Sequence, residues 1–176
     1  WSSVLMALSI LSKMLTLVLI PFMPRQMYWS RITLFGIVSV IASIMVFWLS
    51  FGTHTGWLES VRLWFSSFEF NASIYYLISA LGMSMKGYNI IAVAGPALAM
   101  LTIAGIAGIW WIFIRKPGMD WAVAMLAVLT LYFLMSTTVH PWYIGSLLAL
   151  SVLSRHIYPI VWSCLIFLSY SHYADG

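Results

Sequence analysis

Charged residues are scarce in this chain. Its 176 residues include only 8 Lys and Arg and 4 Asp and Glu, so 7% are charged, against about 25% in a typical soluble domain. Hydrophobic residues make up 63% of the chain, and the mean hydropathy is +1.01. A single soluble core of this length cannot enclose that much apolar surface. The composition therefore excludes a soluble globular protein and a disordered region, and it leaves the lipid bilayer as the solvent.

Cysteine is nearly absent as well. Cys164 is the only one, which excludes an internal disulfide and a metal cluster built on cysteines. The net charge of +4 is scattered along the chain without forming a basic patch, which argues against a nucleic-acid partner. The sequence contains no metal-ligand spacing and no glycine-rich phosphate loop, so we expect no metal and no cofactor.

Six apolar segments approach the roughly 20 residues that a membrane-crossing helix needs. They cover residues 4–22, 32–51, 88–114, 121–139, 141–153 and 157–173. Within the polar segment 52–87, apolar residues at helical spacing predict a surface helix over 57–65, and we expect a second helix over 71–81. We therefore expect an all-α fold, a polytopic transmembrane bundle of about six spans with interfacial helices in one long outer loop. Residues 1–176 would form a single transmembrane domain, a fragment of a longer protein truncated at both ends.

The basic residues predict which way the chain crosses the membrane. One set of alternate connections carries five of them and the opposite set carries two; the five are Arg25, Arg31, Arg115, Lys116 and Arg155. By the positive-inside rule the first set is cytoplasmic. Segment 52–87 and the sequence around Pro141 then face outside.

A helix break is expected at Pro141. One helix over residues 121–155 would be roughly 52 Å long, well beyond the ~30 Å hydrocarbon core. Proline suits the first position of a new helix, where its missing N–H is no loss. The hydroxyl of Thr137 or Thr138 can bond backbone groups that the break leaves free.

Lys13 is a candidate binding residue because it lies halfway along the first apolar segment. A charged side chain at that depth costs about 2.5 to 3.5 kcal/mol on insertion scales and is a functional suspect for that reason. One interpretation is a cation that faces a polar cavity and pairs with a phosphate or carboxylate. The other is an ion pair with a residue outside this chain, or a position nearer the outer surface.

The corner, residues 137–143, brings two hydroxyls, an imidazole, an indole and a phenol to the outer surface. His140, Trp142 and Tyr143 suit a sugar or phosphate, which they can bind through hydrogen bonds and ring stacking. The alternative is a helix start capped by proline and anchored by aromatic rings.

Glu69 and Asn71 place a carboxylate and an amide on the same outer side. They can bind a substrate hydroxyl, although one carboxylate is no catalytic pair. Alternatively, Asn71 or Ser73 caps the following helix, with Glu69 favourable near its N-terminus.

Three features together resemble the C-terminal half of a GT-C superfamily glycosyltransferase, most closely the bacterial polyprenyl-phosphate-dependent mannosyltransferase-like membrane proteins. They are the string Phe70-Asn71-Ala72-Ser73-Ile74-Tyr75-Tyr76, the first span with Lys13 and Pro21, and above all His140-Pro141-Trp142-Tyr143. The resemblance implies a multi-pass enzyme of the bacterial inner (plasma) membrane. Such an enzyme moves mannose or a similar hexose from a polyprenyl-phosphate donor to a glycan or lipid acceptor on the extracytoplasmic face.

The same resemblance implies roles for some of the candidate site residues. The family's catalytic acid lies in the first outer loop near the N-terminus, which this chain does not contain, so the catalytic residue is unknown. The resemblance implies that the corner from His140 to Tyr143 forms part of the outer cavity wall. It also implies that Lys13 pairs with the donor phosphate. Two other classes stay open: a transporter or flippase for a lipid-linked or small solute, which broken helices and Lys13 also suit, and a non-catalytic membrane assembly subunit.

Overall fold

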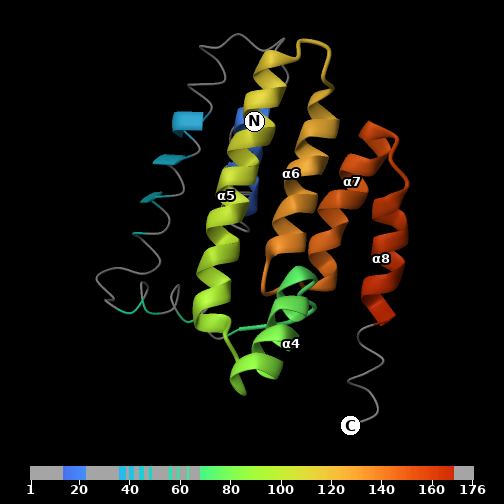
Figure 1. Cartoon of the computed structure of the whole chain (residues 1–176). Coiled ribbons are helices and arrows are strands. Elements are labelled where there is room, and N and C mark those ends of the chain that lie inside the picture. The colour runs from blue at the N-terminus through green and yellow to red at the C-terminus, as the bar shows by residue number, and fades with distance from the viewer. Residues whose placement is uncertain are drawn as a thin grey trace. The chain divides into compact units, whose positions relative to one another are not determined.

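The computed structural model describes residues 14–22, 36–38, 40–41, 44–45, 48, 56, 59, 63 and 68–168. The chain divides into two compact units, Trp1–Trp57 and Leu58–Gly176, which are taken in turn below. Regular structure in the described part is helical, which confirms the all-α prediction (Figure 1). The extended backbone there forms one isolated parallel bridge, between Phe70 and Thr138.

In the first unit, residues Met14–Phe22 form a 3-10 helix, η1, with Pro21 inside it. The expected α-helical span over 4–22 is thus a 3-10 helix in its described half. Lys13 and most of the expected span 32–51 lie outside the described residues.

Within residues 68–168, which are described without a gap, the second unit contains five α-helices and one short 3-10 helix. The elements are α4 (Ile74–Lys86), α5 (Ile91–Arg115), α6 (Trp121–Met135), η2 (Pro141–Tyr143), α7 (Ile144–Ser154) and α8 (Tyr158–Leu168). Each of the four later apolar segments contains one of these helices, with ends a few residues from those expected. The surface helix over 57–65 is described only at Glu59 and Leu63, both helical.

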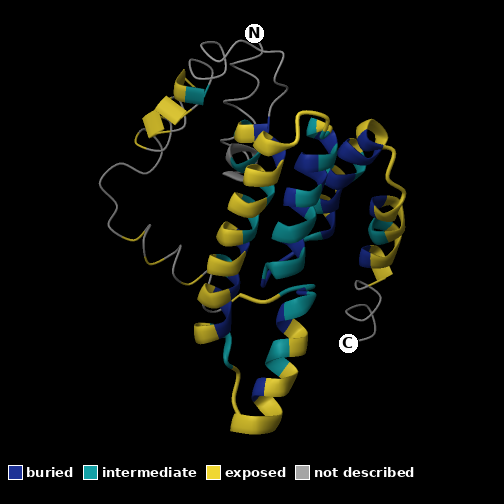
Figure 2. Cartoon of the chain, turned by 45° about the horizontal axis from the view of Figure 1, so that its top comes forward, coloured by how far each residue is buried: buried dark blue, intermediate teal, exposed yellow. Residues whose placement is uncertain are grey.

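Helix α6 is the centre of this unit. It packs against α5, α7 and α4, and its buried residues lie on more than one face, as the dark blue ribbon in Figure 2 shows. Its sequence is apolar on all sides, which is the pattern of a helix surrounded by others. Leu129 and Phe133 are fully buried in it.

A close contact joins α5 to α6 at Gly105. A Cβ atom added there would lie 2.5 Å from Cδ2 of Leu131, so only a glycine fits at this position without a shift. A Cβ added at Gly108 would meet nothing within 4 Å.

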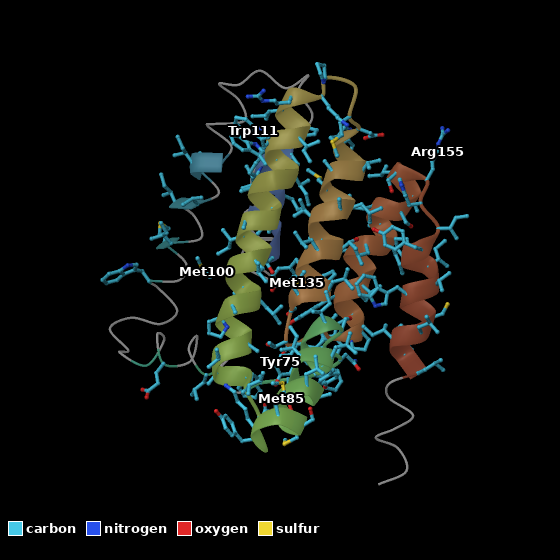
Figure 3. The ribbon with its side chains drawn as sticks, viewed as in Figure 1. Tyr75, Met85, Met100, Trp111, Met135 and Arg155 are labelled. Carbon is cyan, nitrogen blue, oxygen red and sulfur yellow. The ribbon has the colours of Figure 1, made fainter. Side chains whose placement is uncertain are left out.

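Successive helices from α5 to α8 run in alternating directions (Figure 1). The α5–α6 and α7–α8 turns, which carry Arg115, Lys116 and Arg155, lie at one end of the unit, here called the basic end. The corner and α4 lie at the opposite end, here called the corner end. The side-chain view shows Arg155 and Trp111 at the first end and Tyr75 at the second (Figure 3).

One described helix, α5, is long and apolar enough to cross a membrane by length and composition. Three shorter apolar stretches accompany it: Trp121–Met135, Pro141–Ser154 and Tyr158–Leu168. The expected number of membrane crossings stays a prediction.

Candidate functional site

The corner begins where α6 ends. Ser136, the residue after the last turn, is extended, with φ −71° and ψ 142°. Its hydroxyl donates to the Thr138 carbonyl at 2.9 Å, and the Thr138 N–H donates back to the Ser136 oxygen at 3.3 Å. Pro141 then opens η2, so the predicted break is confirmed. The hydroxyl that bonds the local backbone belongs to Ser136 rather than to Thr137 or Thr138.

A second segment is bound directly to this corner. The Phe70 N–H donates to the Thr137 carbonyl at 2.9 Å, and the Val139 N–H donates to the Phe70 carbonyl at 2.7 Å. The Thr138 hydroxyl adds a bond of 3.1 Å to the Phe68 carbonyl, across 70 residues of sequence. Three hydrogen bonds thus hold the Phe70 segment against the corner, and two motifs far apart in the chain become one site.

Four aromatic rings meet at this junction, with His140 between the others. The His140 and Trp142 rings are stacked, with centroids 4.4 Å apart and planes 5° apart. Phe70 lies 5.2 Å from the imidazole centroid, and the Tyr143 ring meets it edge-on at 5.3 Å. Trp142 is 58% exposed, so this indole is available to a ligand.

The imidazole of His140 is partly buried by these rings. Burial disfavours the charged form and lowers the pKa of His140 below its ordinary value of 6.5. The ring is therefore neutral at pH 7. A neutral imidazole offers one N–H donor and one nitrogen acceptor, which suits a sugar hydroxyl or a phosphate oxygen.

Glu69 is tied to α4 and α5 through Asn89. The Asn89 amide donates to both oxygens of the Glu69 carboxylate, at 3.4 and 3.3 Å. Its oxygen accepts from the Tyr75 hydroxyl at 2.8 Å and from the Ile91 N–H at 3.0 Å. Burial and the nearby Glu69 carboxylate raise the pKa of the Tyr75 phenol, so the hydroxyl keeps its proton. This network places one carboxylate beside the Phe70 segment.

Asn71 adds an amide next to Phe70. Its backbone has a positive φ of 51°, a conformation that asparagine tolerates better than most residues. The Nδ2 atom is buried and has no hydrogen-bond partner in the structure. Helix α4 begins after Ser73, whose side chain makes no capping bond. Ser73 thus occupies the N-cap position, as one alternative predicted, but contributes no side-chain bond there. The Asn71 amide stays a candidate donor to a ligand.

The structure brings five of the six candidate residues to the corner end. Glu69 and Asn71 flank Phe70 in the chain, and His140, Trp142 and Tyr143 form the ring cluster that Phe70 touches. The sixth, Lys13, lies outside the described residues. Among the residues that are described, no three His, Cys, Asp or Glu side chains group as a metal site would require.

Sequence reasoning missed Asn89 and Tyr75. An asparagine just before a long apolar run is a helix-start signal, and Asn89 does accept from the Ile91 N–H, the first of α5. Its second role, holding Glu69 from 20 residues away, leaves no mark in local sequence. The sequence places Tyr75 in the string 70–76 but does not indicate its bond to Asn89.

Comparison of the chain with protein-family models, with curated proteins and with solved structures found no match. The glycosyltransferase resemblance therefore stays a prediction from the motifs. The geometry of the corner end is the basis for a functional proposal.

Proposed function

We propose that this chain is part of a membrane glycosyltransferase that moves mannose or a similar hexose from a polyprenyl-phosphate donor to a glycan or lipid acceptor on the extracytoplasmic face. The observation that carries the proposal is the bonding of the Phe70 segment to the corner. It brings the stacked rings next to the Glu69 carboxylate and to the Asn71 amide, whose buried Nδ2 has no hydrogen-bond partner. Aromatic faces and hydrogen-bonding groups in that combination suit a sugar.

Exposed apolar surface supports a bilayer as the surroundings. Large apolar side chains stand outward on α5 and α8, with Val93 74% and Leu165 58% exposed, and Figure 2 shows both helices largely in yellow. Patches of this extent on a protein surface mark contact with lipid or another protein. The hydroxyls of Thr102 and Thr130 bond carbonyls of their own helices at 2.8 Å, which satisfies them without water.

The arrangement suggests a division of roles. The exposed indole of Trp142 stacks on the sugar ring, while Glu69 and Asn71 bind its hydroxyls. Neutral His140 donates one hydrogen bond to a phosphate or hydroxyl oxygen, and Lys13 pairs with the donor phosphate. A lipid phosphate keeps its chain in the bilayer and presents its sugar at the interface, where the corner lies in the proposed orientation. The catalytic acid of the proposed reaction is not assigned to a residue.

The proposal is tested with the full-length protein in proteoliposomes that contain a radiolabelled polyprenyl-phosphate hexose and an acceptor. Replacing Trp142 with Leu should lower kcat/KM at least about fivefold, since the lost ring contact is worth on the order of 1 kcal/mol or more. Trp110→Leu is the matched control, because Trp110 is also exposed but lies on α5 toward the basic end, and it should leave the rate close to wild type.

Two outcomes would contradict the proposal. Equal rates in Trp142→Leu and Trp110→Leu would show that the corner is not part of the sugar-binding site. Movement of intact labelled donor across the bilayer, without transfer of sugar to the acceptor, would indicate the transporter or flippase instead.

A further inference from the structure

A groove of about 430 Å³ lies along α6, away from the candidate site. Its wall is one face of α6 together with the start of α8. The lining residues are Val123, Leu126, Ala127, Thr130, Leu131, Leu134, His156 and Tyr158. Six of these come from α6 at helical spacing, so the groove follows the helix axis for about 17 Å.

The groove offers an apolar surface to whatever fills it. Its two hydroxyls, on Thr130 and Tyr158, are hydrogen-bonded to each other, and Thr130 also donates to the Leu126 carbonyl. Both hydroxyls are therefore satisfied within the protein and do not require a polar ligand. Ile157, just before α8, and Ile160, in its first turn, are exposed, so the surface around the groove is apolar too. A hydrocarbon chain fits this lining, and a sugar does not.

The basic end of the groove has the opposite character. His156 lines it, with Nδ1 2.8 Å from the Ser154 carbonyl. Arg155, next in the chain, is exposed in a left-handed turn with φ 57°. Lys116 lies in the other turn at this end, and Arg115 is stacked over Trp111 at 4.2 Å.

The described carboxylate at this end belongs to Asp120, and it accepts the Ala122 N–H at 2.8 Å as the cap of α6. The basic end thus carries three cationic side chains, Arg115, Lys116 and Arg155, and one described carboxylate, which already caps α6. This excess of positive charge favours the binding of an anionic lipid headgroup at the basic end.

We propose that this groove binds an anionic phospholipid, with one acyl chain along α6 and the phosphate beside Arg155 and His156. The length of the groove supports a phospholipid: about 17 Å is close to the ~15 Å of hydrocarbon in one leaflet, and far short of an extended long-chain isoprenoid. The site differs from the proposed sugar site in place and in chemistry. It lies against the opposite end of the helices, so either proposal can fail without the other.

The test uses the full-length protein, purified in mild detergent and incubated with phosphatidylglycerol or phosphatidylcholine of equal chain length. Native mass spectrometry measures the bound lipid. Wild type should retain one phospholipid and prefer the anionic one about fivefold, the factor expected for one basic residue beside an anionic headgroup. Equal retention of the two lipids, or none of either, would overturn the proposal.

Two variants, each with a control, test the binding of the acyl chain and the recognition of the headgroup separately. Ala127→Trp fills the groove and should abolish retention, while Ala107→Trp, at an exposed position on α5, should not. Arg155→Gln should retain lipid but lose the preference, while Lys116→Gln should keep most of it. Because Arg155 is exposed, its variant decides the question even if Ala127→Trp does not fold, and an unchanged preference in Arg155→Gln would contradict the assignment.

Discussion

The imidazole of His140 lies flat on the indole of Trp142, with ring centroids 4.4 Å apart and planes within 5° of parallel. Stacking on one face fixes the indole and leaves the exposed part of Trp142 for a ligand. Because the Phe70 ring also contacts the His140 imidazole, with centroids 5.2 Å apart, the orientation of the rings depends on the segment that carries Glu69 and Asn71. The relationship links both motifs to one binding surface.

Conservative changes in this pair should lower activity without unfolding the protein. We expect His140→Asn and Trp142→Phe each to reduce transfer by about 5-fold to 150-fold, the range that corresponds to losing roughly 1 to 3 kcal/mol of hydrogen bonding or stacking. Membrane levels and thermal midpoints should stay near those of wild type, since both positions keep a side chain suited to a helix start at an interface. Wild-type kinetics in both variants would show that the corner only shapes the start of the helix and does not bind substrate.

The bond from the Thr138 hydroxyl to the Phe68 carbonyl should contribute to stability. Thr138 is 6% exposed, so Thr138→Val should lower the free energy of unfolding by about 1 kcal/mol, measured as a shift in thermal midpoint. Thr102→Val is the matched control, because that buried hydroxyl bonds a carbonyl of its own helix and holds no distant segment. A larger loss at Thr102 than at Thr138 would contradict the role given to the Phe68 contact.

Acid should weaken the corner through His140. Burial lowers its pKa in the folded state below the ordinary 6.5, so the unfolded chain binds the proton more readily and stability falls as the pH drops below about 6.5. We expect the thermal midpoint of wild type to fall between pH 7.5 and 5.5 by more than that of His140→Asn. Parallel pH profiles for the two proteins would show that this imidazole is not responsible.

Packing between α5 and α6 predicts different outcomes at two glycines. Gly105→Leu places a side chain where a Cβ atom already approaches Leu131 to 2.5 Å, and overpacking of this kind costs about 1 to 3 kcal/mol. Gly108→Leu points into open space and should be neutral or slightly stabilising, because leucine favours a helix over glycine. Thermal unfolding of the two variants measures the difference, and similar midpoints would contradict the close contact.

Much of the second unit follows from local sequence. The helices α5 and α6 fill apolar runs interrupted by Pro117 and Gly118, and Pro141 opens the next helix as its fixed φ dictates. Helix ends were less predictable: α6 ends at Met135 rather than 139, because the backbone is extended at Ser136 and then bonds to Phe70 through Thr137 and Val139. That pairing depends on a contact across the fold, and no local pattern in either motif reveals it.

The candidate site shows the same limit. Residue type alone nominated His140, Trp142 and Glu69, because stacking rings and carboxylates suit a sugar. Their common location came only from the folded chain. The support that Asn89 gives Glu69 arises from tertiary packing between the ends of α4 and α5, which periodicity cannot show.

The central claim is that residues 68–71 and 140–143 line one sugar-binding site. A polyprenyl-phosphate hexose with a photoactivatable group on the sugar, bound to the full-length protein in nanodiscs, tests it most directly through mass spectrometry of the cross-linked peptides. The account predicts cross-links in both segments, competed by unlabelled donor and lost in Trp142→Leu. Competable cross-links confined to other segments, such as the turn at Arg115 and Lys116, would contradict it.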